Sequence, residues 1–279
     1  MKKTHLFPDQ ILPLLLTGVV FVVVSILLYI EISLLNRTVF TREHIVLHLR
    51  WGDILIGLTI YLKTSIDFAI YIGRLMAKYP GWKNRVMIEI GTAVGNALGT
   101  LAILVLWDLF REVRVLMALM IFVAALVLFR LAEEGLEHVK DEQGKYKVSF
   151  WGLEVWFERL LSLVNRASAP VLSRLVPKLS VSDEQKKSYR TLFLLSFTIP
   201  FILGLDDFAG YIPLFNIVNV FGFGIGVFLG HMLLNIFLFL SPSRTIKMVK
   251  HPVISFFGSI AFVGLAMWGL VEAARLFVK

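Results

Sequence analysis

A short motif places an aspartate inside an apolar run at two points of the chain. The hexapeptide at 67–72, DFAIYI, recurs at 207–212 as DFAGYI, with five identities in six positions. An ionised side chain at the centre of a bilayer costs about 3 kcal/mol on insertion scales, so such residues usually face a bundle interior or a watery cavity. Asp67, and Asp207 or its neighbour Asp206, are therefore candidates for an ion-binding site.

A second polar motif recurs in the same order. The pattern G-x-x-x-G-N-x-L at 91–98 returns at 226–233 as G-x-x-x-G-H-x-L, which places Asn96 and His231 at matching positions. A third match, between 122–124 and 262–264, follows in each copy. Three matches in one order, two of them with polar residues inside apolar runs, favour duplication over chance similarity.

The duplicated polar residues have the donor atoms of a cation site. We predict that Asp67, Asp207, Asn96 and His231 are metal ligands, and that Asp206, Lys63 and Glu89 take part in substrate or ion binding. Carboxylate and amide oxygens suit Mg²⁺, Ca²⁺ or Mn²⁺, and a histidine shifts the preference toward Mn²⁺ or Zn²⁺. Thiolate ligands are excluded because the chain has no cysteine.

Lys63 leaves three interpretations open. It lies four residues before Asp67, so the two could form an ion pair on one helix face that only helps packing. It could instead pair with Asp206 across the two copies, or neutralise a carboxylate when the site is empty and move away when a cation or proton arrives.

Other polar residues lie near the ends of the apolar runs. Asp53, Asp108 and Glu112 are predicted to be solvated there. The spacing of His44 and His48 beside Glu43 could bind a metal at the outer face, but two loop histidines are weak evidence for such a site.

Composition indicates an integral membrane protein. Of 279 residues, 57% are hydrophobic and 17% are charged, and the mean hydropathy is +0.78, whereas soluble domains are about 45–50% apolar. The net charge of +8 comes largely from Lys and Arg in short stretches between apolar runs. That distribution fits anionic lipid headgroups rather than nucleic acid.

Seven runs are long enough to cross a bilayer, which needs about 20 apolar residues per helix. The first is too long for a cleaved signal peptide and is interpreted as a retained anchor. The runs span 11–35, 53–72, 86–106, 113–131, 192–212, 215–240 and 253–276. Between the fourth and fifth, residues 148–164 place apolar side chains near helical spacing opposite Glu154, Glu158 and Arg159, which predicts a helix lying in the membrane interface.

The predicted fold class is therefore an all-α integral membrane protein with seven transmembrane helices. Its parts are an N-terminal anchor and outer loop (1–50), a first three-helix repeat (51–131), a cytoplasmic linker with the interfacial helix (132–190) and a second three-helix repeat (191–279). Because each repeat has an odd number of spans, the second must enter the membrane from the opposite face. Basic residues in the short loops favour a cytoplasmic N-terminus.

The aspartate-centred helix, the three-plus-three duplication and the charged central segment together resemble the TerC family of the LysE transporter superfamily, over about 51–274. Members of that family are membrane metal exporters or resistance proteins with seven spans. The resemblance implies that the central aspartates of the first helix in each repeat, here Asp67 and Asp207 or Asp206, are the proposed metal ligands.

These features predict a secondary transporter in the plasma or inner membrane that exports a Mn²⁺-like divalent cation through a midplane site between inverted repeats. The expected partners are the lipid bilayer and the transported cation, with a homodimer possible. No enzyme activity and no resident cofactor are expected. One alternative is a transporter of a small organic or anionic solute that uses Lys63 and His231. Another, ranked last, is an intramembrane lipid-acting enzyme or assembly factor.

Overall fold

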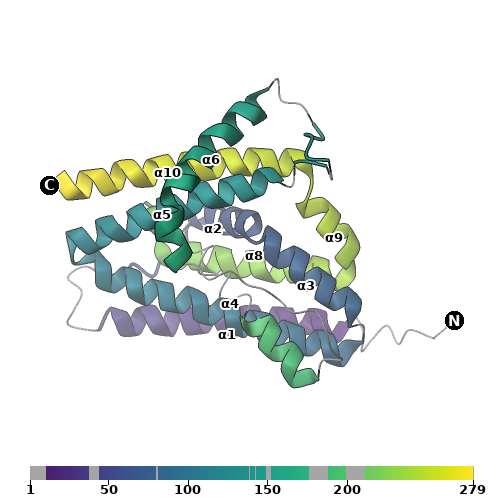
Figure 1. The fold of residues 1–279 in the computed structure, drawn as a ribbon. Helices are drawn as coiled ribbons and strands as arrows, with labels where there is room; N and C mark the ends of the chain where they lie inside the picture. The colour runs from purple at the N-terminus through teal and green to yellow at the C-terminus, as the bar shows by residue number, and fades with distance from the viewer. Residues whose placement is uncertain are drawn as a thin grey trace. The chain divides into compact units, whose positions relative to one another are not determined.

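The computed structural model describes residues 11–37, 44–79, 81–137, 139–141, 143–148, 152–175, 188–198, 211–215 and 217–278. Over these residues the chain is helical apart from turns, the non-helical segment 44–50 and one isolated β-bridge between Lys140 and Tyr146 (Figure 1). The prediction of an all-α chain is confirmed for the part that the structure describes.

Five of the described helices are long and apolar enough to cross a membrane. They are α1 (Leu12–Leu35), α4 (Trp82–Arg111), α5 (Arg114–Glu137), α8 (Val220–Leu240) and α10 (Pro252–Val278). The predicted run at 53–72 is not one straight helix, because α2 (Trp51–Thr64) and α3 (Ile66–Lys78) meet at Ser65 with a bend of 62°. Counted as one span, this pair brings the number to six; most of the predicted run at 192–212 lies outside the described residues.

The helices form two compact units, each built from parts of both predicted repeats. The first unit comprises Met1–Leu109, Glu184–Leu205 and Val218–Ile246. The second comprises Phe110–Asp183, Asp206–Ile217 and Lys247–Lys279.

In the first unit, α8 is the central helix. It packs along α2 and α1 and also contacts α3. Asn219 fixes its first turn, because the Asn219 side chain accepts a hydrogen bond from the Gly222 amide and donates one to the Val46 carbonyl, 2.7 Å away. This cap satisfies a backbone N–H that has no partner within the helix, and it ties α8 to the extended segment before α2.

Glycines make two close helix seams in this unit. A Cβ atom at Gly226 would collide with the Ile54 carbonyl of α2, and one at Gly230 would lie 3.2 Å from Tyr61 Cβ. A Cβ atom at Gly91 of α4 would lie 2.8 Å from the Phe193 carbonyl, and one at Gly95 would collide with that of Phe197. Small residues let helix backbones approach closely in membranes, so both G-x-x-x-G motifs serve as packing surfaces.

The second unit is built on the pair α5 and α10, which pack along most of their lengths. Gly135 of α5 lies against Ser259, whereas Gly269 of α10 lies against Ala125. The two helices therefore run in opposite directions. Helix α6 (Leu153–Leu175) packs on α5, and the short 3₁₀ turn η2 (Ile212–Leu214) contacts both α5 and α10.

The linker before α6 is a small hairpin that anchors this helix. Asp141 Oδ1 accepts hydrogen bonds from the amides of Gln143 and Lys145, closing a turn in which Gly144 has a φ of +76°. Lys140 and Tyr146, on opposite sides of the turn, both donate to the carboxylate of Glu158. The helix predicted at 148–164 is thus present, but it begins at Leu153 and ends at Leu175.

Candidate functional site

A chain of hydrogen bonds joins four polar side chains from three helices of the first unit. Tyr61 of α2 lies with its hydroxyl 2.8 Å from His231 Nδ1. His231 Nε2 is 3.0 Å from the amide nitrogen of Asn235, one turn further along α8. The same amide nitrogen donates to Glu89 Oε2 of α4 at 2.8 Å. We refer to Tyr61, His231, Asn235 and Glu89 as the polar network.

The amide of Asn235 determines the direction of these bonds. Its nitrogen carries two hydrogens, and these point to Glu89 Oε2 and His231 Nε2. His231 Nε2 is then an acceptor, so a neutral imidazole carries its hydrogen on Nδ1 and donates it to the Tyr61 oxygen. Every bond along the chain therefore has one donor and one acceptor.

The polar network is buried among apolar helices. Glu89 and Asn235 have 0% of their surface exposed, and Tyr61 and His231 no more than 4%. Two oxygen atoms, Glu89 Oε1 and Asn235 Oδ1, have no hydrogen-bond partner among the described residues. Buried polar groups usually have partners, and an unpaired carboxylate oxygen is the most costly exception.

Two aromatic rings enclose His231. The Tyr61 ring lies edge-on with its centroid at 5.8 Å, and the Phe68 ring of α3 lies at 5.7 Å. Phe68 lies three residues after the bend at Ser65, in the first turn of α3, so both arms of the bent pair α2 and α3 contact the same imidazole. A change in the bend would therefore move the two walls around His231 relative to one another.

Asn96 and His231, which occupy matching positions in the two predicted repeats, line one small cavity. Both side chains line a small space of about 10 Å³, which Thr17 of α1 also borders. This volume is close to the smallest that holds one water molecule. Asn96 is 6% exposed and lies on α4 two turns beyond Glu89.

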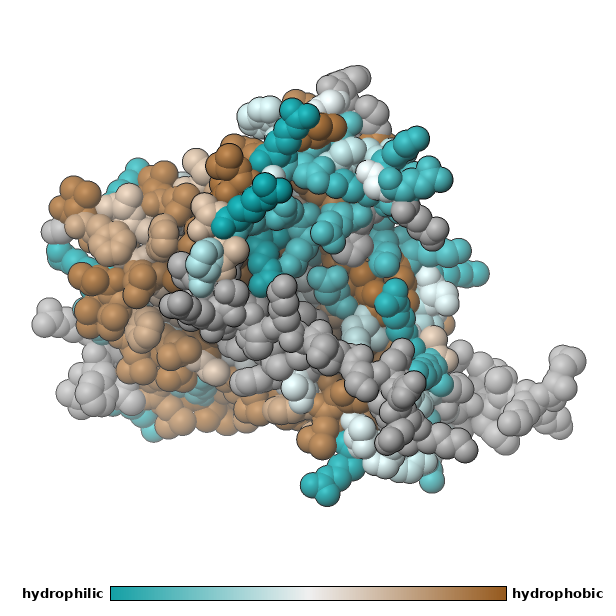
Figure 2. Space-filling view, viewed as in Figure 1, coloured by the Kyte–Doolittle hydropathy of each residue, from teal (hydrophilic) through white to brown (hydrophobic). Residues whose placement is uncertain are grey.

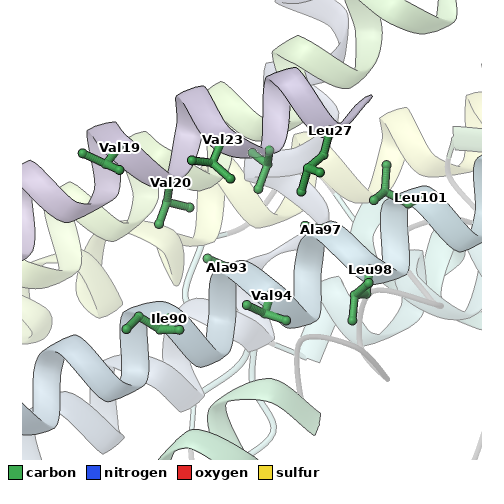
Figure 3. A pocket seen from close by; sticks show the side chains of 11 residues that line it. Val19, Val20, Val23, Leu27, Ile90, Ala93, Val94, Ala97, Leu98 and Leu101 are labelled. Atoms are coloured by element: carbon green, nitrogen blue, oxygen red, sulfur yellow. The ribbon is translucent and has the colours of Figure 1, made fainter. Parts of the chain in front are cut away.

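An apolar groove of about 190 Å³ lies beside this cavity, between α1 and α4 (Figure 3). All its lining residues are Val, Leu, Ile or Ala. Val20, Val24 and Ala93 line both the groove and the small cavity. These three side chains separate the apolar groove from the polar atoms of Asn96 and His231.

Of the predicted acidic metal ligands, only Asp67 lies among the described residues, and it is not a member of the polar network. Asp67 is exposed, at the first turn of α3, and its charge acts on the half-buried Lys63. Asp206 and Asp207 lie outside the described residues. Within the part of the chain that the structure describes, no three His, Asp or Glu side chains are close enough to hold a metal ion together.

Two expectations about carboxylates at helix ends are wrong. Asp53 is 8% exposed and Asp108 only 1%, so neither is solvated as predicted. Asp53 packs against Gly222 of α8, because the close α2–α8 seam extends to the ends of these helices. By contrast, His44 and His48 are exposed, and Glu43 lies outside the described residues.

Two members of the polar network were not among the predicted site residues. Asn235 lies four residues after His231, so helical spacing alone places it on the same face. Tyr61 lies two residues before Lys63, inside an apolar run, and has no comparable signal. No family model, curated protein or solved structure matches the chain.

Proposed function

We propose that this protein is a multi-pass secondary transporter of a divalent metal cation, in which the polar network couples transport to proton or cation binding. The observation that carries the proposal is Glu89, a fully buried carboxyl group with one unpaired oxygen. No Lys or Arg of the described residues is within ion-pair distance of it. Ionisable residues at such positions in membrane helices usually mark ion pathways or proton relays.

The direction of the packed helices supports an inverted duplication. Gly222 lies on Asp53 and Gly230 on Tyr61, so α8 runs parallel to α2. The corresponding seam, between α4 and the helical residues 189–198, is also parallel, since Gly91 contacts Phe193 and Gly95 contacts Phe197. Each predicted repeat thus lays its second helix along the first helix of the other.

The third helices of the repeats give the same indication. Helices α5 and α10 occupy equivalent places in the two predicted repeats, and they pack in opposite directions. Two copies related by an axis in the membrane plane would have this arrangement, and copies inserted in the same sense would not. Inverted repeats of this kind are common in secondary transporters.

The bend between α2 and α3 supports transport independently of the repeats. Broken membrane helices are common where transporters bind substrate or coupling ions, because the interruption leaves backbone groups available. Here the break at Ser65 lies between Tyr61, which bonds to His231, and Phe68, which packs on it. The break and the polar network therefore form one site.

The identity of the transported ion is inferred from the sequence. Asp67, Asp207 or Asp206, Asn96 and His231 are the proposed metal-binding residues, and the resemblance to TerC proteins suggests a Mn²⁺-like ion. Glu89 and Asn235 add two unpaired oxygen atoms to this donor set. Such hard oxygen donors favour Mn²⁺ or Mg²⁺ over softer ions.

The test is uptake of Mn²⁺ into proteoliposomes that contain the purified protein. We expect Glu89→Gln to lower the rate at least about tenfold, because a neutral amide can neither ionise nor balance a cation. The matched control is Glu158→Gln, which changes the same side chain outside the polar network. Wild-type uptake rates in a Glu89→Gln protein that elutes as a folded species would refute the proposal.

The apolar groove between α1 and α4 supports a second candidate, a transporter of a small organic solute. Its lining of Val, Leu, Ile and Ala suits an apolar body, with the polar atoms of His231 and Asn96 nearby. The sequence indicates Lys63 and His231 as the polar contacts of such a solute. Lys63→Met should therefore abolish solute binding, and divalent metals should not raise the melting temperature of the protein.

A further inference from the structure

Helix α6 has two apolar faces, of which only one is packed. Phe157, Leu161 and Val164 point into the core formed with α5 and α10. Besides Val155, which is 41% exposed, four other large apolar residues point away from that core and are exposed. They are Leu153 (55%), Trp156 (63%), Leu160 (43%) and Leu163 (70%).

The four exposed side chains form one continuous stripe. Their spacing of three, four and three residues places them along a single side of the helix. Arg159 and Arg166, both exposed, lie along one edge of this stripe. We call these six residues the outer stripe of α6.

Contacts on the inner face show where α6 lies along the spanning helices. Asn165 donates to the Phe129 carbonyl and to Glu133, near the C-terminal end of α5. Phe157 packs on Phe256, in the second turn of α10, with ring centroids 6.5 Å apart. The α5 residues at this level include the ion pair of Arg130 with Glu134. Helix α6 therefore lies at the polar ends of two membrane helices.

The pictures agree with this position. Helix α6 crosses α5 and α10 at a steep angle instead of running beside them (Figure 1). Hydrophilic side chains gather on the side where α6 lies, and hydrophobic ones toward the opposite ends of α5 and α10 (Figure 2). A helix that crosses two spans at their polar ends lies along the plane of the membrane surface.

We propose that α6 is an interfacial helix whose outer stripe binds anionic phospholipid. Leu153, Trp156, Leu160 and Leu163 insert between the acyl chains, and Arg159 and Arg166 pair with headgroup phosphates. An apolar stripe with Trp and flanking cations has the composition of helices that bind this surface. The proposal is independent of the transport reaction, because no residue of the polar network takes part.

Site-directed spin labelling tests the insertion of the stripe. The chain has no cysteine, so a single cysteine carries the nitroxide at a unique position. Labels at Trp156→Cys and Leu163→Cys, in vesicles with phosphatidylglycerol, should collide more often with oxygen, which concentrates in lipid, than with a water-soluble nickel complex. A label at Ser162→Cys, off the stripe, should show the reverse preference.

Two other results would overturn the insertion. Equal access of nickel to all three labels would show that the stripe faces water. Protection of the stripe labels from both reagents would show that protein covers it, as a second copy of the chain would.

The arginines have a separate test. Addition of phosphatidylglycerol to the protein in neutral detergent should raise its melting temperature more than phosphatidylcholine does. The double variant Arg159→Gln/Arg166→Gln should lose most of this difference, while Arg114→Gln, at the far end of α5, should keep it. Loss of the difference in both variants, or in neither, would refute binding at the outer stripe.

Discussion

Glu89 and Glu158 are residues of the same type, one buried between membrane helices and the other partly exposed in the linker region. The carboxylate of Glu158, in the linker region, accepts hydrogen bonds from Lys140 and Tyr146, and its side chain is 34% exposed. Glu89, between membrane helices, is fully buried and accepts a single described hydrogen bond, from the neutral amide of Asn235.

The difference separates a carboxylate with charged and hydroxyl donors from one without them. Glu158 has a cation and a hydroxyl donor, and it anchors α6 to the hairpin before it. Glu89 has no such compensation, and an unpaired carboxyl group in an apolar interior destabilises the fold. Its burial is accounted for if the group binds a proton or a cation during the working cycle.

The largest expected effect concerns the helix seam that holds the polar network together. Gly226→Val would drive a side chain into the Ile54 carbonyl of α2, so we expect a loss of at least about 3 kcal/mol and little folded protein. Gly264→Val on α10 is the control, since no described atom lies within 4 Å of its Cβ position. Size-exclusion profiles after mild heating compare the two, and equal profiles would contradict this packing.

A smaller effect is expected inside the polar network. His231→Phe keeps an aromatic ring but removes the hydrogen bonds to the Tyr61 hydroxyl and to the Asn235 amide, at a cost of about 1–3 kcal/mol. A double-mutant cycle with Tyr61→Phe should give a coupling energy above about 0.5 kcal/mol. The matching cycle of Tyr146→Phe with Glu158→Gln should give less, because water reaches that pair; a reversed order would break the comparison.

The smallest expected effect is the contribution of Glu158 to the pH dependence of the protein's stability. Burial alone would raise the pKa of this carboxyl, but the hydrogen bonds from Lys140 and Tyr146 outweigh it and lower the pKa below 4.5. The stabilisation is therefore present above pH 4.5 and is lost as the pH falls through the lowered pKa. Exposed pairs contribute at most about 1 kcal/mol. Glu158→Gln should flatten the acid side of a plot of melting temperature against pH, and an unchanged slope would show that the pair contributes nothing.

The sequence predicts the positions of the described helices well, and their bends and the contacts between them less well. Apolar length alone locates the helices of the described spans, because the thickness of the bilayer sets that length. Recurrence of G-x-x-x-G brings Asn96 and His231 to one cavity. The bend at Ser65 is not predicted, since no Pro or Gly adjoins it, although four of the five residues at 63–67 are polar or charged.

Partners across helices are the least predictable part. The position of Asn235 on the same helix face as His231 is predictable, because it follows His231 by one turn. The sequence indicates Glu89 as a candidate, but not its bond to Asn235, which joins residues 146 positions apart. The rotation of each helix about its own axis decides such contacts. This rotation is set by the glycines of all the close helix contacts acting jointly, and the sequence of one helix alone does not reveal it. The same argument explains the burial of Asp53, which depends on Gly222.

The amide of Asn235 has a consequence for the order of events along the polar network. Both of its hydrogens are already committed, one to a carboxylate oxygen and one to an imidazole nitrogen. A proton that arrives on His231 Nε2 must displace the amide from that nitrogen, because the nitrogen has a single lone pair, whereas a proton can bind the unpaired Glu89 Oε1 without displacing the amide from Oε2. The Asn235 side chain thus contacts a titratable group on each of two helices, Glu89 on α4 and His231 on α8, and a rotation of its amide would change both hydrogen bonds.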